Sequence, residues 1–362
     1  MPIRDYFAGT YSEARQKFLD AAHEARGRLT AYTIADGQGP HGEPLSIDVA
    51  RLGPDEPDSV LLLISATHGI EGFCGSGCQV GYLTDQLYGA VSPRTGTILI
   101  HALNPYGFAW MRRVNEDNID LNRNFRDFSK PLPDSSTYEA IHDWLVPEDW
   151  DGPNRRTADA ALVQYIKERG MAAFQAAVSG GQYTRPTGLF YGGRGESWSN
   201  TTLRSILKDS LAPSVKKLAV LDFHTGLGPM GYGEPIYLGP PDEGFERAKK
   251  WYGPEVTSTL RGTSASAAIA GALPEVFLGL AGTVEVTYLA LEYGTLPLME
   301  VLTSLRADHW LHAVPDRQTP LRGQIERQMR NAFYVDTPVW KAAVYGRAAD
   351  FVVRAARALA SS

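Results

Sequence analysis

The hydrophobic positions of this chain fall into unbroken runs at three places. Residues 59–65 read Ser-Val-Leu-Leu-Leu-Ile-Ser, and residues 96–103 and 217–223 are also largely apolar. Unbroken runs of this length are typical of strands that are covered on both faces, whereas strands with one face in water alternate. We therefore expect a central sheet that is buried between two layers of other elements.

Strand and helix patterns alternate along the rest of the chain. Strand patterns occupy residues 29–34, 45–52 and 283–293, and polar loops are predicted at 104–128 and 225–235. Helical patterns cover residues 10–26, 72–87, 157–179, 243–252, 297–311, 320–333 and 339–360. This alternation predicts an α/β fold, with a mostly parallel, mixed central sheet in a three-layer α/β/α arrangement.

The composition is that of an ordinary globular protein. Of 362 residues, 43% are hydrophobic and 21% are charged, and the net charge is −6. This length suits one large α/β domain, so we expect a single domain over residues 1–362, with a catalytic core at about 50–315 and C-terminal helices at about 316–362. The net negative charge does not indicate a basic surface that would bind nucleic acid, so no nucleic-acid partner is expected.

The sequence shows no signal for a membrane or for export. No apolar run approaches the roughly 18 residues that a membrane-spanning helix needs. Residues 1–9 contain Arg4 and Asp5 but no apolar segment of a secretory signal. Cytoplasmic residence without a membrane partner is therefore the expectation. The two cysteines, Cys74 and Cys78, are expected to pack a helix against the sheet as free thiols.

Two histidines and a glutamate stand where two apolar runs end. His68 and Glu71 follow the 59–65 run in a glycine-rich loop, and His224 follows the 217–223 run. Ligands of open α/β sheets sit outside the carboxyl ends of the strands, so these side chains are expected to share one site. Two imidazoles and a carboxylate form the ligand set of a catalytic zinc that keeps a fourth position open for water. The pattern predicts a metal-dependent hydrolase with one zinc ion, although nickel or cobalt would satisfy the same ligands.

Four motifs together resemble those of the zinc carboxypeptidases. They are HxxE at residues 68–71, DLNRNF at 120–125, DFHTG at 222–226 and Leu-Glu-Tyr-Gly at 291–294. The chain is also similar to the deacylase relatives of these enzymes, the aspartoacylase and succinylglutamate desuccinylase group. It is most similar to a bacterial carboxypeptidase-like branch whose substrates are generally undefined. The resemblance covers most of residues 50–300 and implies a zinc carboxypeptidase-like fold.

The resemblance implies a role for each matching residue. His68, Glu71 and His224 would bind the zinc ion. Asn122 and Arg123 match the pair that grips the terminal carboxylate of a substrate. A guanidinium presents the planar, two-pronged donor array that a carboxylate accepts, which is consistent with this role.

Three further roles have competing candidates or interpretations. Arg113 is expected beside the metal, where it would stabilise the developing oxyanion, with Arg112 as its competitor or as a further substrate-binding residue. Glu292 matches the general base of the family, and Glu285, seven residues earlier, competes with it. Asp222 either supports the metal ligands from behind or packs at the end of its strand.

The implied reaction is hydrolysis of an amide bond next to a free carboxylate. Zinc would lower the pKa of its bound water from 15.7 towards about 7, and Glu292 would carry the proton to the leaving amine. The first expectation is a carboxypeptidase-like metallopeptidase, because no C-terminal β-domain of the deacylase kind is recognisable after residue 300. The alternatives are an N-acyl amino acid deacylase and a non-catalytic relative that binds a peptide or a metal. The expected partner is a small-molecule or peptide substrate with a free carboxylate.

Overall fold

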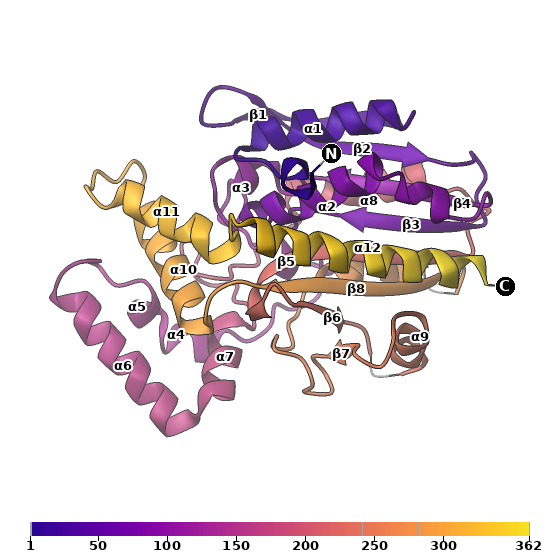
Figure 1. Cartoon of the computed structure of the whole chain (residues 1–362). Helices are drawn as coiled ribbons and strands as arrows, with labels where there is room; N and C mark the ends of the chain where they lie inside the picture. The colour runs from indigo at the N-terminus through magenta and orange to yellow at the C-terminus, as the bar shows by residue number, and fades with distance from the viewer. Residues whose placement is uncertain (1, 241, 281, 362) are drawn as a thin grey trace.

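The computed structural model describes residues 2–240, 242–280 and 282–361 (Figure 1). The strands are β1 (Arg28–Gln38), β2 (Pro44–Leu52), β3 (Ser59–Ile64), β4 (Thr95–His101), β5 (Lys217–Met230), β6 (Gly233–Tyr237), β7 (Thr257–Ser258) and β8 (Glu285–Gly294). They form one sheet in the order β1-β2-β4-β3-β5-β8-β6-β7. The central strands β4, β3, β5 and β8 are parallel, whereas β1 and β2 on one side and β6 on the other add antiparallel pairs. The expected mixed, mostly parallel sheet is confirmed.

Helices cover both faces of this sheet (Figure 1). The helices are α1 (Tyr11–Glu24), α2 (Gly72–Thr84), α3 (Pro105–Ala109), α4 (Ser136–Glu139), α5 (His142–Leu145), α6 (Pro153–Arg169), α7 (Met171–Ser179), α8 (Trp198–Ser210), α9 (Glu243–Tyr252), α10 (Leu298–His312), α11 (Arg322–Phe333) and α12 (Pro338–Ala360). Apolar residues of α1, α2 and α12 belong to the core on one face, and those of α8 belong to the core on the other. The three-layer arrangement is therefore confirmed.

Strand β3 shows why two layers form. Leu61 and Leu63 pack into the core that contains α2 and α12, whereas Leu62 and Ile64 pack into the core that contains α8. All residues of β3 are buried. An unbroken apolar run is therefore needed here, because each face of the strand contacts its own hydrophobic layer.

Helix α2 lies close to the sheet at Gly75, where the absence of a side chain lets the helix and the strand approach. A Cβ atom at Gly75 would stand 2.7 Å from the Cβ of Ser65, the residue that follows β3. The buried free thiols of Cys74 and Cys78 belong to the same helix, as expected. Glu71 stands at the amino-terminal cap of α2. Close packing of α2 on the sheet therefore fixes the position of Glu71.

The prediction of a loop at residues 225–235 is wrong. Strand β5 continues to Met230, and β6 begins directly after a turn. Gly226, Gly228 and Gly231 have φ values of 137°, 96° and 72°, and the pairing of β5 with β8 shifts register between Gly226 and Met230. Glycines that accommodate a bulge and a tight turn give the sequence the composition of a loop, although the backbone remains paired.

Two other segments depart from the predicted pattern in detail. The helical pattern at residues 157–179 is divided into α6 and α7 by Gly170, whose φ is 83°. The polar segment 104–128 is a loop as expected, apart from α3 and a 3₁₀ turn at Leu121–Arg123. Helices α4 to α7 lie with α10 and α11 beyond one end of the sheet, on the left of Figure 1. Among the described residues, no helix combines the length and the apolar character needed to cross a membrane.

Candidate metal centre

The candidate site lies where the parallel strands β3, β5 and β8 approach their carboxyl ends. His68 and Glu71 stand in the turn between β3 and α2, and His224 lies within β5. His224 pairs in register with Glu292 on the neighbouring strand β8. The sheet therefore gathers side chains from distant parts of the sequence at one edge, which is where ligands of open α/β sheets bind.

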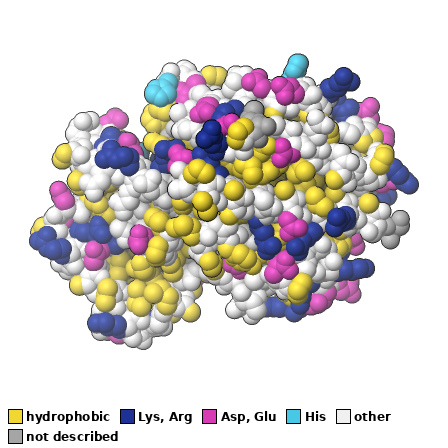
Figure 2. All heavy atoms as spheres, in the orientation of Figure 1, with side chains coloured by type: hydrophobic (Ala, Val, Ile, Leu, Met, Phe, Trp, Pro, Cys, Tyr) yellow, Lys and Arg dark blue, Asp and Glu magenta, His cyan; other side chains and the backbone are white. Residues whose placement is uncertain are grey.

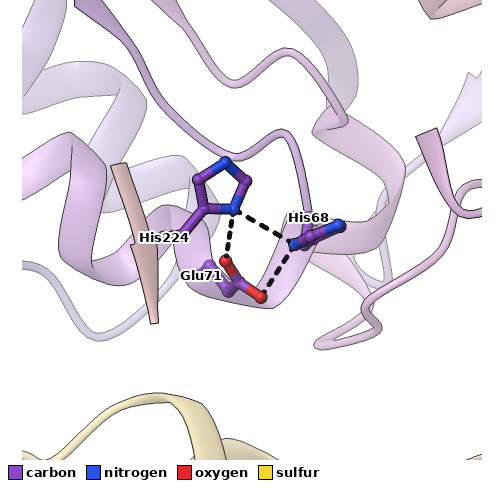
Figure 3. A group of neighbouring side chains, drawn as sticks. All are labelled: His68, Glu71 and His224. Atoms are coloured by element: carbon purple, nitrogen blue, oxygen red, sulfur yellow. Dashed lines mark hydrogen bonds and ion pairs between the residues drawn. The ribbon is translucent and has the colours of Figure 1, made fainter. Parts of the chain in front are cut away.

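The side chains of His68, Glu71 and His224 converge (Figure 3). The Nδ1 atom of His68 lies 2.9 Å from Oε1 of Glu71, and Nδ1 of His224 lies 3.1 Å from Oε2 of the same carboxylate. The two Nδ1 atoms are 3.3 Å apart. One ligand atom from each residue lies within 4.8 Å of the others, and all three side chains are buried. The structure thus brings together the three residues that the sequence predicted as neighbours.

The hydrogen bonds of the two imidazoles suit a cation between them. Nε2 of His224 lies 2.7 Å from Oδ2 of Asp222, and Nε2 of His68 lies 3.2 Å from Oδ1 of Asp120. A ring that donates its Nε2 hydrogen to a carboxylate keeps the lone pair on Nδ1, which is then available to a metal. The Nδ1 atoms of the two rings lie 3.3 Å apart and both face the Glu71 carboxylate, an arrangement that a cation between them would satisfy. The donor set therefore fits a divalent metal ion.

Asp222 is held by partners on three sides. Besides His224, Oδ1 of Asp222 accepts a hydrogen bond from the Thr67 hydroxyl at 2.9 Å, and Oδ2 accepts one from the Tyr288 hydroxyl at 2.8 Å. Carboxylates that are fixed in this way orient the histidines that ligate a metal. Of the two interpretations that the sequence left open, these contacts favour support of His224 over packing at the strand end.

Sequence reasoning misses Asp120, which supports the other histidine. Its Oδ2 atom accepts a hydrogen bond from Nε of Arg113 at 3.0 Å, while Oδ1 lies next to His68. Burial raises the pKa of Asp120, but the charges of Arg113 and His68 outweigh burial and hold that pKa well below its usual range. The available signal was its place at the start of the DLNRNF motif, in which only Asn122 and Arg123 were assigned roles.

The adjacent arginines of the loop have different surroundings. Arg113 donates from Nη1 to Oε1 of Glu71 at 3.0 Å, and its Nη2 lies 2.7 Å from Nε2 of His68. Arg112 instead donates to Oδ2 of Asp308 on α10, from Nη2 at 3.1 Å and from Nε at 3.2 Å. Arg113 therefore lies beside the three converging side chains, whereas Arg112 is turned towards α10.

Glu292 is buried beside the same group. Its Oε1 atom accepts a hydrogen bond from the backbone N–H of Leu227 at 2.9 Å. Burial and the charge of Glu71 raise the pKa of Glu292 to about 7, against the opposing effect of His224. A carboxyl whose pKa lies near neutrality is suited to take up and return a proton. Glu285 stands at the opposite end of β8 with a side chain that is 43% exposed, so it is remote from this group.

Asn122 and Arg123 form the 3₁₀ turn near Asp120. Arg123 donates from Nε and Nη2 to the backbone oxygen of Ser179, and from Nη1 to the backbone oxygen of Asn122. These bonds use three of the five guanidinium hydrogens, which leaves one on each terminal nitrogen. The amide oxygen of Asn122 accepts from the backbone N–H of Leu273 at 2.8 Å, so its NH₂ group is the part left for a ligand.

Phe190 is a second residue that sequence reasoning misses. Its ring centroid lies 5.3 Å from Cζ of Arg113 and 5.4 Å from Cζ of Arg123, so two buried guanidinium groups share one aromatic ring. Its φ is 54°, a conformation that bulky residues rarely adopt and that is found preferentially at functional sites. No sequence pattern marks Phe190, because its place depends on this backbone angle and on two distant arginines.

These groups border one cavity of about 130 Å³. The predicted site residues that line it are His68, Arg113, Asn122, Arg123, His224 and Glu292. The other two, Glu71 and Arg112, lie outside its lining: Glu71 contacts both histidines, and Arg112 packs on α10. The rest of the lining is mostly apolar and comes largely from α7, α10, β6 and residues 266–269.

The mixed sheet with helices on both faces defines a three-layer α/β protein. Bovine thrombin-activatable fibrinolysis inhibitor, in complex with tick carboxypeptidase inhibitor, has a similar structure, with a TM-score of 0.51 and 10% identity over 97% of each chain. Carboxypeptidase A from Helicoverpa armigera has a TM-score of 0.45 and 12% identity, over 94% of this chain and 73% of its own. Metallo-carboxypeptidase from Burkholderia cenocepacia has a TM-score of 0.41 and 14% identity, over 94% and 70%. The first of these likenesses confirms the carboxypeptidase-like fold.

The sequence itself identifies the family. The chain belongs to the family described as "Protein of unknown function (DUF2817)", which matches residues 7–347. No curated protein matches the chain.

Proposed function

We propose that this protein is a zinc-dependent hydrolase that cleaves an amide bond next to a free carboxylate. One observation carries the proposal: the two histidines of the metal group, the Glu292 carboxyl and the Arg123 guanidinium all border the same cavity. A metal site, a proton carrier and a carboxylate-binding cation are the parts that such a hydrolase requires. These three parts together account for the charged and metal-ligating groups that border the cavity.

His68, Glu71 and His224 would hold one zinc ion. When bound there, zinc acts as a Lewis acid that lowers the pKa of a bound water towards about 7 and polarises a carbonyl group. Asp222 supports this role because it orients His224, and Nε2 of His68 lies between Asp120 and Nη2 of Arg113. Zinc is proposed because two histidines and a carboxylate are typical ligands of a catalytic zinc, and nickel or cobalt would satisfy the same ligand set.

Glu292 would act as the general base and then as the general acid. The Leu227 N–H fixes its Oε1 atom, so Oε2 is the oxygen that takes the proton from water and returns it to the leaving amine. Its pKa of about 7 supports both roles near neutral pH. Positioned proton transfer of this kind typically contributes roughly 10²–10⁴-fold to the rate.

The two arginines would bind the charged parts of the substrate. Arg113 lies beside the metal ligands, where its guanidinium would stabilise the negative charge that develops on the carbonyl oxygen. Arg123 would grip the free carboxylate with the two hydrogens that its backbone bonds leave on the terminal nitrogens, assisted by the NH₂ group of Asn122. Arg112 has no such role in this proposal, because it is paired with Asp308.

Two observations bear on the choice between a peptidase and a deacylase. The described residues after β8 form the helices α10 to α12, and the β-domain that the resemblance leads us to expect in a deacylase is not among them, which supports a carboxypeptidase-like peptidase. The cavity borders the Arg123 guanidinium and the Glu292 carboxyl, which a short peptide and an N-acyl amino acid would use alike. We therefore propose a carboxypeptidase-like metallopeptidase, with N-acyl amino acid deacylation as the second candidate.

The proposed partners are small substrates with a free carboxylate. Figure 2 shows basic and acidic side chains interspersed on one face of the molecule, which supports the prediction that nucleic acid is not a partner. Cytoplasmic residence stays a prediction from the sequence. A non-catalytic role as a peptide- or metal-binding relative is disfavoured, because such a protein has no chemical need for a buried Glu292 with a pKa of about 7.

Hydrolysis by the zinc-loaded protein tests the proposal. N-acetyl dipeptides and N-acetyl amino acids would be offered to the wild type, to Glu292→Gln and to Glu285→Gln, a matched control at the other end of β8. We expect turnover by the wild type and by Glu285→Gln, and a loss of roughly 10²–10⁴-fold in Glu292→Gln. An inert wild type that contains zinc and binds these compounds would refute the hydrolase.

A further inference from the structure

Two buried arginines of the site carry like charges and share two neighbours. The side chains of Arg113 and Arg123 are only 12% and 4% exposed. The carboxylate of Asp120 lies 3.0 Å from Nε of Arg113 and 3.9 Å from Nη1 of Arg123. The ring of Phe190 is the second shared neighbour, because its centroid lies 5.3 Å and 5.4 Å from the two Cζ atoms. One carboxylate and one aromatic ring therefore offset the repulsion between the two cations.

An aromatic ring attracts a guanidinium group without using any of its hydrogens. Three of the five N–H hydrogens of Arg123 are already donated to backbone oxygens. A polar or acidic side chain at position 190 would compete for the remaining two, which the proposed carboxylate grip requires. The face of Phe190 instead attracts the cation through the quadrupole of the ring. A ring therefore suits a position where an arginine has to be held and still be free to bind a substrate.

The backbone around Phe190 is tied to the segments next to it. The carbonyl of Phe190 accepts a hydrogen bond from the N–H of Gln182 at 3.1 Å, and the carbonyl of Tyr191 accepts one from the N–H of Asp120 at 2.8 Å. The side chain of Phe190 is 8% exposed and lines the cavity. Its φ of 54° is a conformation that a bulky residue adopts only at an energetic cost. The fold thus keeps a ring at this place in spite of the strain.

We infer that Phe190 is a positioning residue that holds the guanidinium groups of Arg113 and Arg123 at a fixed spacing. The inference rests on the proposed function, in which Arg113 stabilises the oxyanion and Arg123 grips the free carboxylate. In one substrate molecule, the scissile carbonyl and the carboxylate are a defined distance apart. Both arginines can therefore engage the same molecule only if their spacing matches that distance. Phe190 takes no part in the bond changes and acts through the two arginines.

Substitution by leucine removes the ring but keeps an apolar side chain. Zinc-loaded protein would be assayed on N-acetylglycyl-L-alanine and N-acetyl-L-alanine. We expect Phe190→Leu to lower kcat and to raise KM, each by about tenfold, because the ring contacts both arginines. Phe190→Tyr keeps the ring and should recover most of both losses, and the zinc Kd should stay unchanged. A lower kcat with an unchanged KM, without recovery in Phe190→Tyr, would reduce Phe190 to a packing residue and overturn the inference.

A series of fluorinated rings separates attraction from packing. Fluorine withdraws electrons from the ring face, so it weakens the attraction for a cation while the shape of the ring is nearly preserved. Incorporation of 4-fluoro-, 3,5-difluoro- and pentafluorophenylalanine at position 190 should lower kcat/KM stepwise, by on the order of tenfold at full fluorination. The same series at Phe128 is the matched control and should leave kcat/KM unchanged. The ring of Phe128 lies 5.8 Å from Cζ of Arg126, and neither residue is among the described residues that line the cavity. Equal kcat/KM throughout the series at position 190 would refute the inference.

Binding to an inactive variant separates this inference from the proposed function. Calorimetry would measure the affinity of N-acetyl-L-alanine for zinc-loaded Glu292→Gln with each fluorinated ring at position 190. Affinity that falls with fluorination, without hydrolysis of any substrate by the wild type, would keep the positioning role of Phe190 and refute the hydrolase. Hydrolysis that is insensitive to fluorination at position 190 would keep the hydrolase and refute the inference. Absence of both binding and turnover would refute both.

Discussion

The two ends of the cavity are built in different ways. At the metal end, each functional side chain has fixed polar partners: His224 contacts Asp222 and Glu71, and Arg113 contacts Asp120 and Glu71. At the apolar end, the lining from α7 and α10 is positioned by hydrophobic packing. Hydrogen-bonded groups hold a reaction geometry to a fraction of an ångström, whereas packed aliphatic groups define a volume. Changes at the first end should therefore affect chemistry, and changes at the second should affect the choice of substrate.

Loss of the metal should have the largest effect. A chelator is expected to abolish turnover, and added zinc should restore it, because the water that reacts depends on the ion. Zinc at about 1,000 times its Kd should also stabilise the fold by about 4.1 kcal/mol. Thermal unfolding with and without zinc measures this. In Glu71→Ala both effects should disappear, whereas Glu285→Ala should keep them. Zinc-dependent stabilisation that persists in Glu71→Ala would place the ion elsewhere.

The neighbouring arginines should separate chemistry from stability. Arg113→Met is expected to lower kcat by about 10²–10³-fold, as for the loss of one donor to a developing oxyanion. Arg112→Met leaves the buried carboxylate of Asp308 without its partner, which typically costs about 3–5 kcal/mol of folding stability. Steady-state kinetics on folded protein and chemical denaturation measure the two effects. The reverse result, with lost chemistry in Arg112→Met, would exchange the proposed roles.

The carboxylate behind His224 should affect metal affinity more than kcat. Asp222→Asn keeps the size of the side chain but removes its charge, and a weaker partner for a ligating histidine typically costs about 10–100-fold in metal affinity. Zinc titration against a competing chelator measures the Kd. Thr67→Val, which removes one hydrogen bond to Asp222, is the graded control and should change the Kd less. Wild-type affinity in Asp222→Asn would show that this contact is only packing.

The smallest effect is expected at the apolar end. Val178→Ala on α7 removes two methyl groups from the cavity wall, each worth about 0.8 kcal/mol when buried. We expect kcat/KM for a short substrate that fills the cavity to fall by up to roughly tenfold, mainly through KM, while the zinc Kd stays unchanged. Kinetics and zinc titration on the same preparation check both statements. A drop in zinc affinity would mean that the two ends of the cavity are coupled.

The metal end could largely be anticipated from the sequence, because its residues follow strands. Each unbroken apolar run predicts a buried strand, and a polar residue just beyond such a run is expected at the carboxyl end of that strand. Glu292 was separable from Glu285 only through motif resemblance, and the structure places them at opposite ends of β8. Spacing along one strand decides which of two glutamates reaches the site.

The remaining parts depended on contacts that no local pattern reveals. Arg112 and Arg113 are adjacent and chemically identical, and they are distinguished by Asp308 on a helix late in the chain. The bulged continuation of β5 resembled a loop because Gly226 and its neighbouring glycines also occur in turns. Phe190 carries no signal, since its positive φ is imposed by the surrounding fold. The walls from α7 and α10 are likewise set by tertiary packing.

The close contact of α2 with the sheet at Gly75 has a consequence for the kind of ion that this architecture accepts. Glu71 stands at the cap of a helix that packs closely on the strands at Gly75. The distance between the helix and the sheet at this contact therefore sets the distance from the Glu71 carboxylate to the imidazoles. A single added methyl group at Gly75, one helical turn from the ligand, would lift the helix and move the oxygen donors outwards. A preference for a larger cation would thus require a change in the buried packing of α2 on the sheet, while every coordinating side chain could stay the same.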